Sequence, residues 1–268
     1  MMEVIDKVYV IGRGNIVVVD DVKKQPIHVH DKVKVRDLQF EVVGVEFSQY
    51  MKQGGLILRP NNKVEEIKIN DKIEKVMKCL LIIDAQEDFL DGGKLGVNGA
   101  RNIMDNCTVF VNEHGKDYAI SIATADFHSP DHCSFKDNGG IWPPHCIQHS
   151  VGAAIYEPLL MSLHKNSVFF EVLTKGTDDN HEEYSIFKNE KSAAKLIELV
   201  KKFNIEEIDV AGIAYNYCVA DTVKDGLRML PDVKFRVLKN FCPAIPDGTE
   251  NDFTNFINST ERVCLVEG

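Results

Sequence analysis

Two hydrophobic patterns divide this chain. Through residues 1–76, apolar runs such as Leu56-Ile57-Leu58 and an alternation of apolar and polar positions over 27–35 are broken by glycine and aspartate. Short strands at this spacing are typical of small barrels and sandwiches. We therefore predict a small all-β barrel domain over residues 1–76.

A different pattern begins at Cys79. The run Leu80-Leu81-Ile82-Ile83 is continuously apolar, as expected for a strand buried on both faces of a parallel sheet. Beyond it, strand-like and helix-like segments alternate, which predicts a doubly wound, mostly parallel α/β sheet over residues 77–268. We expect strands at 118–125, 168–173, 205–213, 234–238 and 263–266, and helices at 98–114, 191–203, 217–229 and 248–258.

Composition narrows the classes of function. The 268 residues carry a formal net charge of −10, which argues against nucleic acid and membrane surfaces as partners. No apolar run approaches the ~20 residues that span a bilayer, and residues 1–7 lack the pattern of a secretory signal. The seven cysteines are scattered and odd in number. We therefore expect a reducing compartment, the cytoplasm, rather than a disulfide framework.

Charged side chains stand at the ends of the predicted strands. Asp84, Asp126 and Lys175 each end an apolar run, and in doubly wound sheets the active site lies beyond the carboxyl ends of the strands. Because a buried carboxylate is costly, Asp84 is explained either by function or by capping a helix. Taken alone, Lys175 is explained equally by ordinary solvation.

One carboxylate and three imidazoles lie close together in the sequence. Asp126, His128, His132 and His145 fall within the span 126–145, and an Asp and a His two residues apart at a strand end can converge on one ion. Mixed oxygen and nitrogen ligands suit Zn²⁺, Mn²⁺ or Fe²⁺. The alternative is a set of loop histidines that make ordinary hydrogen bonds.

A cysteine stands where a strand turns into a helix. Cys218 follows the predicted strand 205–213 and lies near the start of the helix 217–229. The first N–H groups of a helix favour a thiolate. The alternative is a buried thiol that packs as a small hydrophobic side chain.

Together these motifs are specific. The segments Ile83-Asp84-Ala85-Gln86, Thr124-Ala125-Asp126-Phe127-His128, Trp142-Pro143-Pro144-His145-Cys146, Thr174-Lys175-Gly176 and Gly212-Ile213-Ala214 with Cys218-Val219 occur in this order. In these motifs the chain resembles the nicotinamidase/pyrazinamidase branch of the isochorismatase-like cysteine hydrolases over residues 79–268. The resemblance implies hydrolysis of nicotinamide to nicotinate and ammonia through a cysteine thioester, in NAD salvage.

The resemblance also implies a role for each motif residue. Cys218 would be the nucleophile, Asp84 its proton acceptor, and Lys175 the cation that lowers the pKa of the thiol. The remaining roles are metal ligation by Asp126, His128 and His145, with His132 as a ligand in some members, a ring sandwich by Phe89 and Trp142, and an oxyanion hole from the N–H groups of Ala214 and Cys218. One divalent ion is implied, zinc ahead of manganese or iron.

Two features leave alternatives open. The segment Tyr215-Asn216-Tyr217 before the cysteine departs from the usual sequence of the family and affects the shape of the pocket. Another small amide therefore stays a second hypothesis for the substrate.

The N-terminal segment resembles the second-domain barrel of translational GTPases such as elongation factor Tu, in motifs that include Gly12-Arg13-Gly14. It lacks a phosphate-binding loop, and its role is unassigned. A third reading makes the barrel a binding module with the hydrolase domain as passenger, and self-association into a homo-oligomer is also open.

Overall fold

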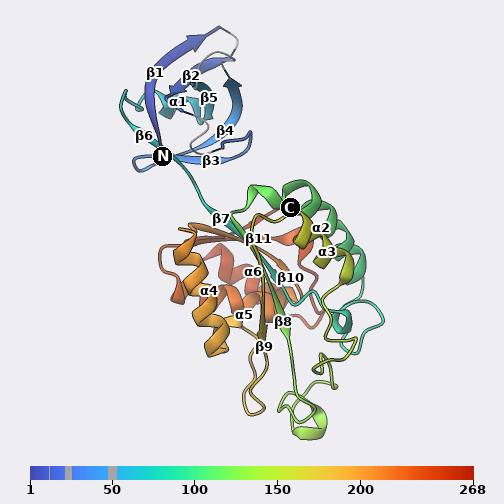
Figure 1. The fold of residues 1–268 in the computed structure, drawn as a ribbon. Helices are drawn as coiled ribbons and strands as arrows, with labels where there is room; N and C mark the ends of the chain where they lie inside the picture. The colour runs from blue at the N-terminus through green and yellow to red at the C-terminus, as the bar shows by residue number, and fades with distance from the viewer. Residues whose placement is uncertain (12, 22–25, 48–52) are drawn as a thin grey trace. The chain divides into compact units, whose positions relative to one another are not determined.

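The computed structural model describes residues 1–11, 13–21, 26–47 and 53–268. These residues form two compact units, Met1–Val76 and Met77–Gly268, which Figure 1 draws as ribbons. Gly12, part of the Gly-Arg-Gly motif, lies outside the described residues. The described part of the chain contains no helix both long and apolar enough to cross a membrane.

The first unit is a closed six-stranded antiparallel barrel with the strand order β1-β2-β5-β4-β3-β6. Its apolar residues alternate: Val33 and Val35 are buried, whereas Lys32 and Lys34 are half-exposed. The strands are β1 Met2–Val10, β2 Gly14–Val19, β3 Lys32–Val35, β4 Leu38–Phe47, β5 Gly54–Arg59 and β6 Lys72–Lys75, with one helical turn, α1 Asn61–Val64.

The expectation of a strand over 27–35 is only partly right. The strand begins at Lys32, and His30 lies in a turn with a positive φ of 74°. The side chain of Asp31 explains this turn, because it accepts the N–H of His28 at 2.8 Å and pairs with Lys75 at 2.9 Å. Residues 28–30 therefore close a polar turn instead of extending the ladder.

The second unit is built on a six-stranded sheet with the order β12-β11-β10-β7-β8-β9. Every neighbouring pair in it is parallel, which confirms the predicted α/β fold. The strands are β7 Lys78–Ile83, β8 Ile120–Asp126, β9 Phe170–Lys175, β10 Glu207–Gly212, β11 Lys234–Leu238 and β12 Val263–Val266.

Helices cover both faces of this sheet (Figure 1). Along β7, Leu80 and Ile82 pack in one core with α2 and α3, while Leu81 and Ile83 pack in the other with α4, α5 and α6. Burial on both faces explains the continuous apolar run. The helices are α2 Ala100–His114, α3 Glu157–Asn166, α4 Glu190–Lys202, α5 Ala220–Met229 and α6 Glu250–Asn258.

The order of the strands places the topological switch point of the sheet between β7 and β10. From β7 the chain builds β8 and β9 toward one edge, and β10 then starts on the other side of β7 and continues to β11 and β12. The connections that follow these two central strands leave toward opposite sides, which is where ligands bind in open α/β sheets. Asp84 follows β7 and Cys218 follows β10.

Candidate active site

Lys175 is the centre of a buried polar cluster. It ends β9 with a fully buried side chain, and its Nζ lies 2.9 Å from Oδ2 of Asp84 and 2.6 Å from Oδ1 of Asp126. The same Nζ lies 3.5 Å from Sγ of Cys218. Burial lowers the pKa of Lys175, but the two carboxylates raise it well above its ordinary value. The side chain is therefore a cation that joins three strand ends.

Asp84 is held in one orientation by Thr124 of the neighbouring strand. Its φ is 45°, its N–H donates to the Thr124 carbonyl at 3.2 Å, and its Oδ1 accepts the Thr124 hydroxyl at 2.6 Å. Oδ2 is thus the oxygen that faces Lys175. Burial raises the pKa of Asp84 despite the Lys175 charge, and Asp126 adds to the rise. A raised pKa makes Asp84 a better proton acceptor than an ordinary carboxylate.

Cys218 lies in a π-helical turn, Tyr215–Val219, that leads directly into α5. Burial raises the pKa of the thiol well above its ordinary value, Lys175 pulls it down, and Asp84 and Asp126 push it up. Lys175 thus acts in the direction expected from the sequence, but burial outweighs it. A neutral thiol in this position needs a base to form the nucleophile, and an oxygen of Asp84 and the sulfur lie within 4.8 Å of each other.

A second buried group can hold a metal ion. Asp126, His128 and His145 each offer a ligand atom within 4.8 Å of the others. His128 donates from Nδ1 to the Gly176 carbonyl at 2.9 Å, and His145 donates from Nδ1 to the Pro143 carbonyl at 2.8 Å. These bonds leave both Nε2 atoms as lone-pair donors, which is the arrangement typical of metal-binding histidines. The residues present therefore fit a divalent ion.

His132 lies beside this group and is not one of the three residues that converge. Its ring stands 4.1 Å from that of His128, centroid to centroid. Within the described residues its Nε2 is buried without a hydrogen-bond partner, which fits a fourth ligand. However, Nδ1 accepts the Ser134 N–H at 3.2 Å. A metal on Nε2 would place the ring proton on Nδ1, so this contact would have to give way.

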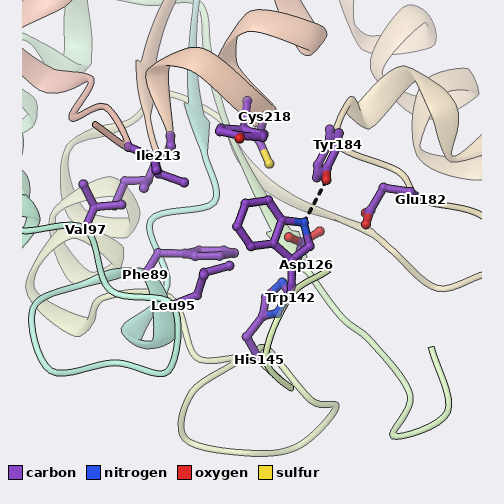
Figure 2. Close-up of a pocket in the computed structure, with 13 residues that line it drawn as sticks. Phe89, Leu95, Val97, Asp126, Trp142, His145, Glu182, Tyr184, Ile213 and Cys218 are labelled. Atoms are coloured by element: carbon purple, nitrogen blue, oxygen red, sulfur yellow. Dashed lines mark hydrogen bonds between the residues drawn. The ribbon is translucent and has the colours of Figure 1, made fainter. Parts of the chain in front are cut away.

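Aromatic side chains wall the pocket that these groups enter. Figure 2 shows Phe89 and Trp142 among the lining residues, close to Cys218. Trp142 donates from Nε1 to the Tyr184 hydroxyl at 2.8 Å, and its ring meets that of Tyr217 edge-on at 5.4 Å. Tyr184 and Tyr217 thus extend the predicted aromatic pair to a continuous wall. Three further loops, which the predicted site did not include, contribute lining residues: Leu95, Val97, Glu182, Tyr184 and Ile245.

The main chain before the cysteine borders the same pocket. The peptide bond between Ile213 and Ala214 is cis, and Ala214 and Cys218 both line the cavity. The Ala214 carbonyl accepts the N–H groups of Tyr217 and Val219 at 3.1 and 3.2 Å. That carbonyl is therefore engaged within the turn, and the oxyanion role of the Ala214 and Cys218 N–H groups stays a prediction.

Through its carboxylate and its backbone, Asp88 connects three segments next to the pocket wall. It accepts the N–H of Cys146 at 2.7 Å and that of Lys94 at 3.3 Å, and these residues adjoin His145 and Leu95. Its own N–H donates to the Gly152 carbonyl at 3.0 Å. A side chain on Gly152 would begin 2.0 Å from the Asp88 carboxylate, so this close approach requires glycine.

Comparisons with known proteins agree with this geometry. The isochorismatase domain family matches residues 78–267. The chain is 33% identical over 156 residues to the nicotinamidase/pyrazinamidase of Mycobacterium tuberculosis, covering 57% of this chain and 80% of that protein. It is 29% identical over 185 residues to the nicotinamidase of Escherichia coli, covering 63% and 84%.

Solved structures give the same result. A pyrazinamidase of Pyrococcus horikoshii in complex with zinc superposes with a TM-score of 0.62 at 26% identity, covering 71% of this chain and 99% of that one. PnC1 from L. infantum in complex with nicotinate superposes with a TM-score of 0.63 at 28% identity, covering 72% and 93%. The family match begins only at residue 78, after the barrel.

Proposed function

The chain belongs to the isochorismatase domain family, and we propose that it hydrolyses nicotinamide to nicotinate and ammonia, in NAD salvage. One observation carries this proposal. The Cys218 thiol lies 3.5 Å from a buried lysine that also contacts Asp84 and Asp126, on the wall of an aromatic pocket. That arrangement provides a nucleophile, a base and a cation for attack on a small aromatic amide.

The first half of the reaction forms a thioester. Oδ2 of Asp84 takes the thiol proton as sulfur attacks the carboxamide carbon. The N–H groups of Ala214 and Cys218 hold the developing oxyanion, an interaction worth ~3 kcal/mol per donor in comparable sites. Asp84 then gives its proton to the departing nitrogen, the C–N bond breaks, and ammonia leaves.

The second half regenerates the cysteine. Asp84 takes a proton from water as the water oxygen attacks the thioester carbon. The C–S bond breaks to release nicotinic acid, which gives its proton to water to become nicotinate, and the sulfur recovers the proton from Asp84. Lys175 stays cationic throughout and stabilises the sulfur anion whenever it forms.

Asp126, His128 and His145 would hold one divalent ion, with His132 as the candidate fourth ligand. A bound ion supplies an electrophilic anchor for the ring nitrogen of the substrate, directly or through water. Zinc is the ion we favour over manganese or iron, since mixed nitrogen and oxygen ligands suit it. Phe89 and Trp142 would stack against the ring that the anchor orients.

An ammonia-release assay on a panel of small amides tests the proposal. The protein is supplied with Zn²⁺, Mn²⁺ or Fe²⁺, and its metal content is measured on the same sample. Release from nicotinamide in wild type, and its loss in Cys218→Ala, is the expected result. Release from another amide alone would support the second reading of the substrate, and no release from any amide would contradict both.

Location and assembly also remain proposals. All seven cysteines are thiols, which supports the reducing cytoplasm expected from the sequence. The barrel is proposed as a region for self-association or for binding a partner. Sedimentation of the full-length protein at several concentrations tests the first role: a single monomeric species throughout would exclude it.

A further inference from the structure

Asn216 binds a distant segment with its side chain. It lies in the π-helical turn, two residues before Cys218. Its Nδ2 donates to the Ile245 carbonyl at 2.9 Å, and its Oδ1 accepts the Ile245 N–H at 3.0 Å. The side-chain amide therefore pairs with both polar groups of one residue, as a neighbouring strand would. Asp247 Oδ1 and Thr249 Oγ1 also lie within 3.0 and 2.8 Å of Nδ2.

Neighbouring residues of the same turn bind the same segment. The hydroxyl of Tyr217 donates to Oδ2 of Asp247 at 2.5 Å. The N–H of Tyr215 donates to the Pro243 carbonyl at 2.8 Å. Hydrogen bonds between residues far apart in sequence thus hold the turn that carries the nucleophile against residues 243–249.

Ile245 gives this fastening a consequence for the substrate. Its side chain lines the pocket along with Tyr217 and Cys218, yet it belongs to a segment without helix or strand between Phe241 and α6. In such a segment the place of a side chain depends on the hydrogen bonds that hold the backbone. The hydrogen bonds from Asn216 hold the backbone of Ile245 itself.

We propose that Asn216 is a positioning residue that fixes Ile245 at a set distance from Cys218 and thereby limits the size of the amide that the pocket admits. This inference rests on the proposed function. Asn216 acts through the Ile245 backbone and stays out of the bond-making steps. Loss of the Asn216 side chain lets Ile245 move away from Cys218. A substrate ring with one extra methyl group then fits, and an unsubstituted ring loses contacts.

A double-mutant cycle tests the inference. Wild type, Asn216→Ala, Ile245→Ala and the double variant are assayed with nicotinamide and with its ring-methyl isomers. A methyl group in an apolar pocket changes specificity by about 10-fold or more. Asn216→Ala is expected to raise KM for nicotinamide more than it lowers kcat, and to shift relative kcat/KM by about 10-fold toward at least one methyl isomer. The double variant should shift no further than Ile245→Ala, because both changes remove the same wall.

Binding provides a readout that does not depend on turnover. Trp142 is the only tryptophan of the chain and lines the pocket, so its fluorescence reports the Kd of nicotinate and of methyl-substituted nicotinates. Asn166→Ala is the matched control, since Asn166 Nδ2 bonds to Asn112 and Ser162 within the α2–α3 region. It removes the same chemical group and should leave both substrate selectivity and ligand selectivity unchanged.

The outcomes separate this inference from the proposed function. If wild type hydrolyses nicotinamide but Asn216→Ala weakens all ligands by the same factor, or adds fully to Ile245→Ala, the positioning role is wrong. If wild type neither turns over nicotinamide nor binds nicotinate, the proposed function fails and the inference fails with it. If wild type binds nicotinate but does not hydrolyse nicotinamide, the ratios of Kd between nicotinate and its methyl-substituted forms alone test the positioning role of Asn216.

Discussion

The two oxygens of one carboxylate, that of Asp126, face two different groups. Oδ1 lies 2.6 Å from Nζ of Lys175, whereas Oδ2 lies 3.7 Å from Nε2 of His128. Burial pushes the pKa of Asp126 upward, but Lys175 and His128 together hold it well below its usual range. The cation beside Cys218 and the candidate metal group therefore share one counter-charge.

Replacing Lys175 with Met should destabilise the fold as well as stop turnover. The change leaves Asp84 and Asp126 buried without their shared cation, and removal of one partner from a buried ion pair costs about 3–5 kcal/mol. Urea unfolding measures the loss. Lys195→Met is the control, because the half-exposed Lys195 pairs with Glu198 on the surface and should change stability by about 0.5 kcal/mol or less. Equal midpoints for the two variants would contradict the buried network.

Replacing Cys218 with Ala should abolish hydrolysis while sparing the pocket. We expect turnover to fall at least about 10³-fold, as when other nucleophiles are removed, with the Tm and the Kd for nicotinate nearly unchanged. Cys264→Ala, at an exposed cysteine, should keep full activity. Thioester trapping by rapid acid quench gives a direct view, and labelled acyl-enzyme in Cys218→Ala would show that another residue is the nucleophile.

Removing a metal ligand should remove the ion. His128→Ala and His145→Ala are each expected to lower metal content far below about one ion per chain, since each deletes one of three converging ligands. His132→Ala should weaken affinity less, because those three remain. Elemental analysis after dialysis measures the content, and His164→Ala on α3 is the control. Full retention in His145→Ala would place the ion elsewhere.

The Tyr217–Asp247 hydrogen bond should persist between about pH 4 and pH 10. This hydrogen bond, together with burial, raises the pKa of Tyr217 to about 12. The same hydrogen bond, together with those from Thr249, lowers the pKa of Asp247 to about 2. The raised tyrosine pKa stabilises the fold below its unfolded value of ~10, a contribution lost as pH rises toward the folded value. The lowered carboxyl pKa stabilises the fold above ~4, a contribution lost as pH falls.

Tyrosinate absorbance near pH ~10.5 tests this coupling. Wild type and Tyr217→Phe should absorb almost equally, because Tyr217 is still un-ionised. In an Asp247→Asn background, adding Tyr217→Phe should remove a clear tyrosinate signal. A large difference already present in the wild-type background would show that the hydrogen bond does not perturb Tyr217.

The sheet and the strand-end residues of the site were open to prediction. Strands buried on both faces leave continuous apolar runs such as that of β7, and parallel order brings the residues at their carboxyl ends to one edge. For that reason the sequence alone allows Asp84, Lys175 and Cys218 to be grouped. Helix α3 was not predicted, because residues 157–166 follow a long irregular stretch and bury only part of one face.

Loop residues of the site lay beyond the reach of sequence patterns. Tyr184, Glu182 and Ile245 line the pocket, but nothing in their spacing reveals which loops return to Cys218. The raised pKa of the Cys218 thiol was likewise not predictable from the sequence. Its neighbours could be inferred, but the degree of burial that raises its pKa depends on how closely the surrounding segments pack.

Asp88 has a consequence for anyone who wishes to redesign the substrate range. Its backbone and carboxylate hold the segments of Leu95, Cys146 and Gly152 at once, and it is joined in sequence to Phe89. The aromatic wall and the candidate metal ligand His145 are thus mounted on one support. A substitution at one of these positions alone will disturb the others, because Asp88 holds them together. Changes of substrate specificity will come more readily from substitutions at Ile245, which Asn216 holds independently of Asp88.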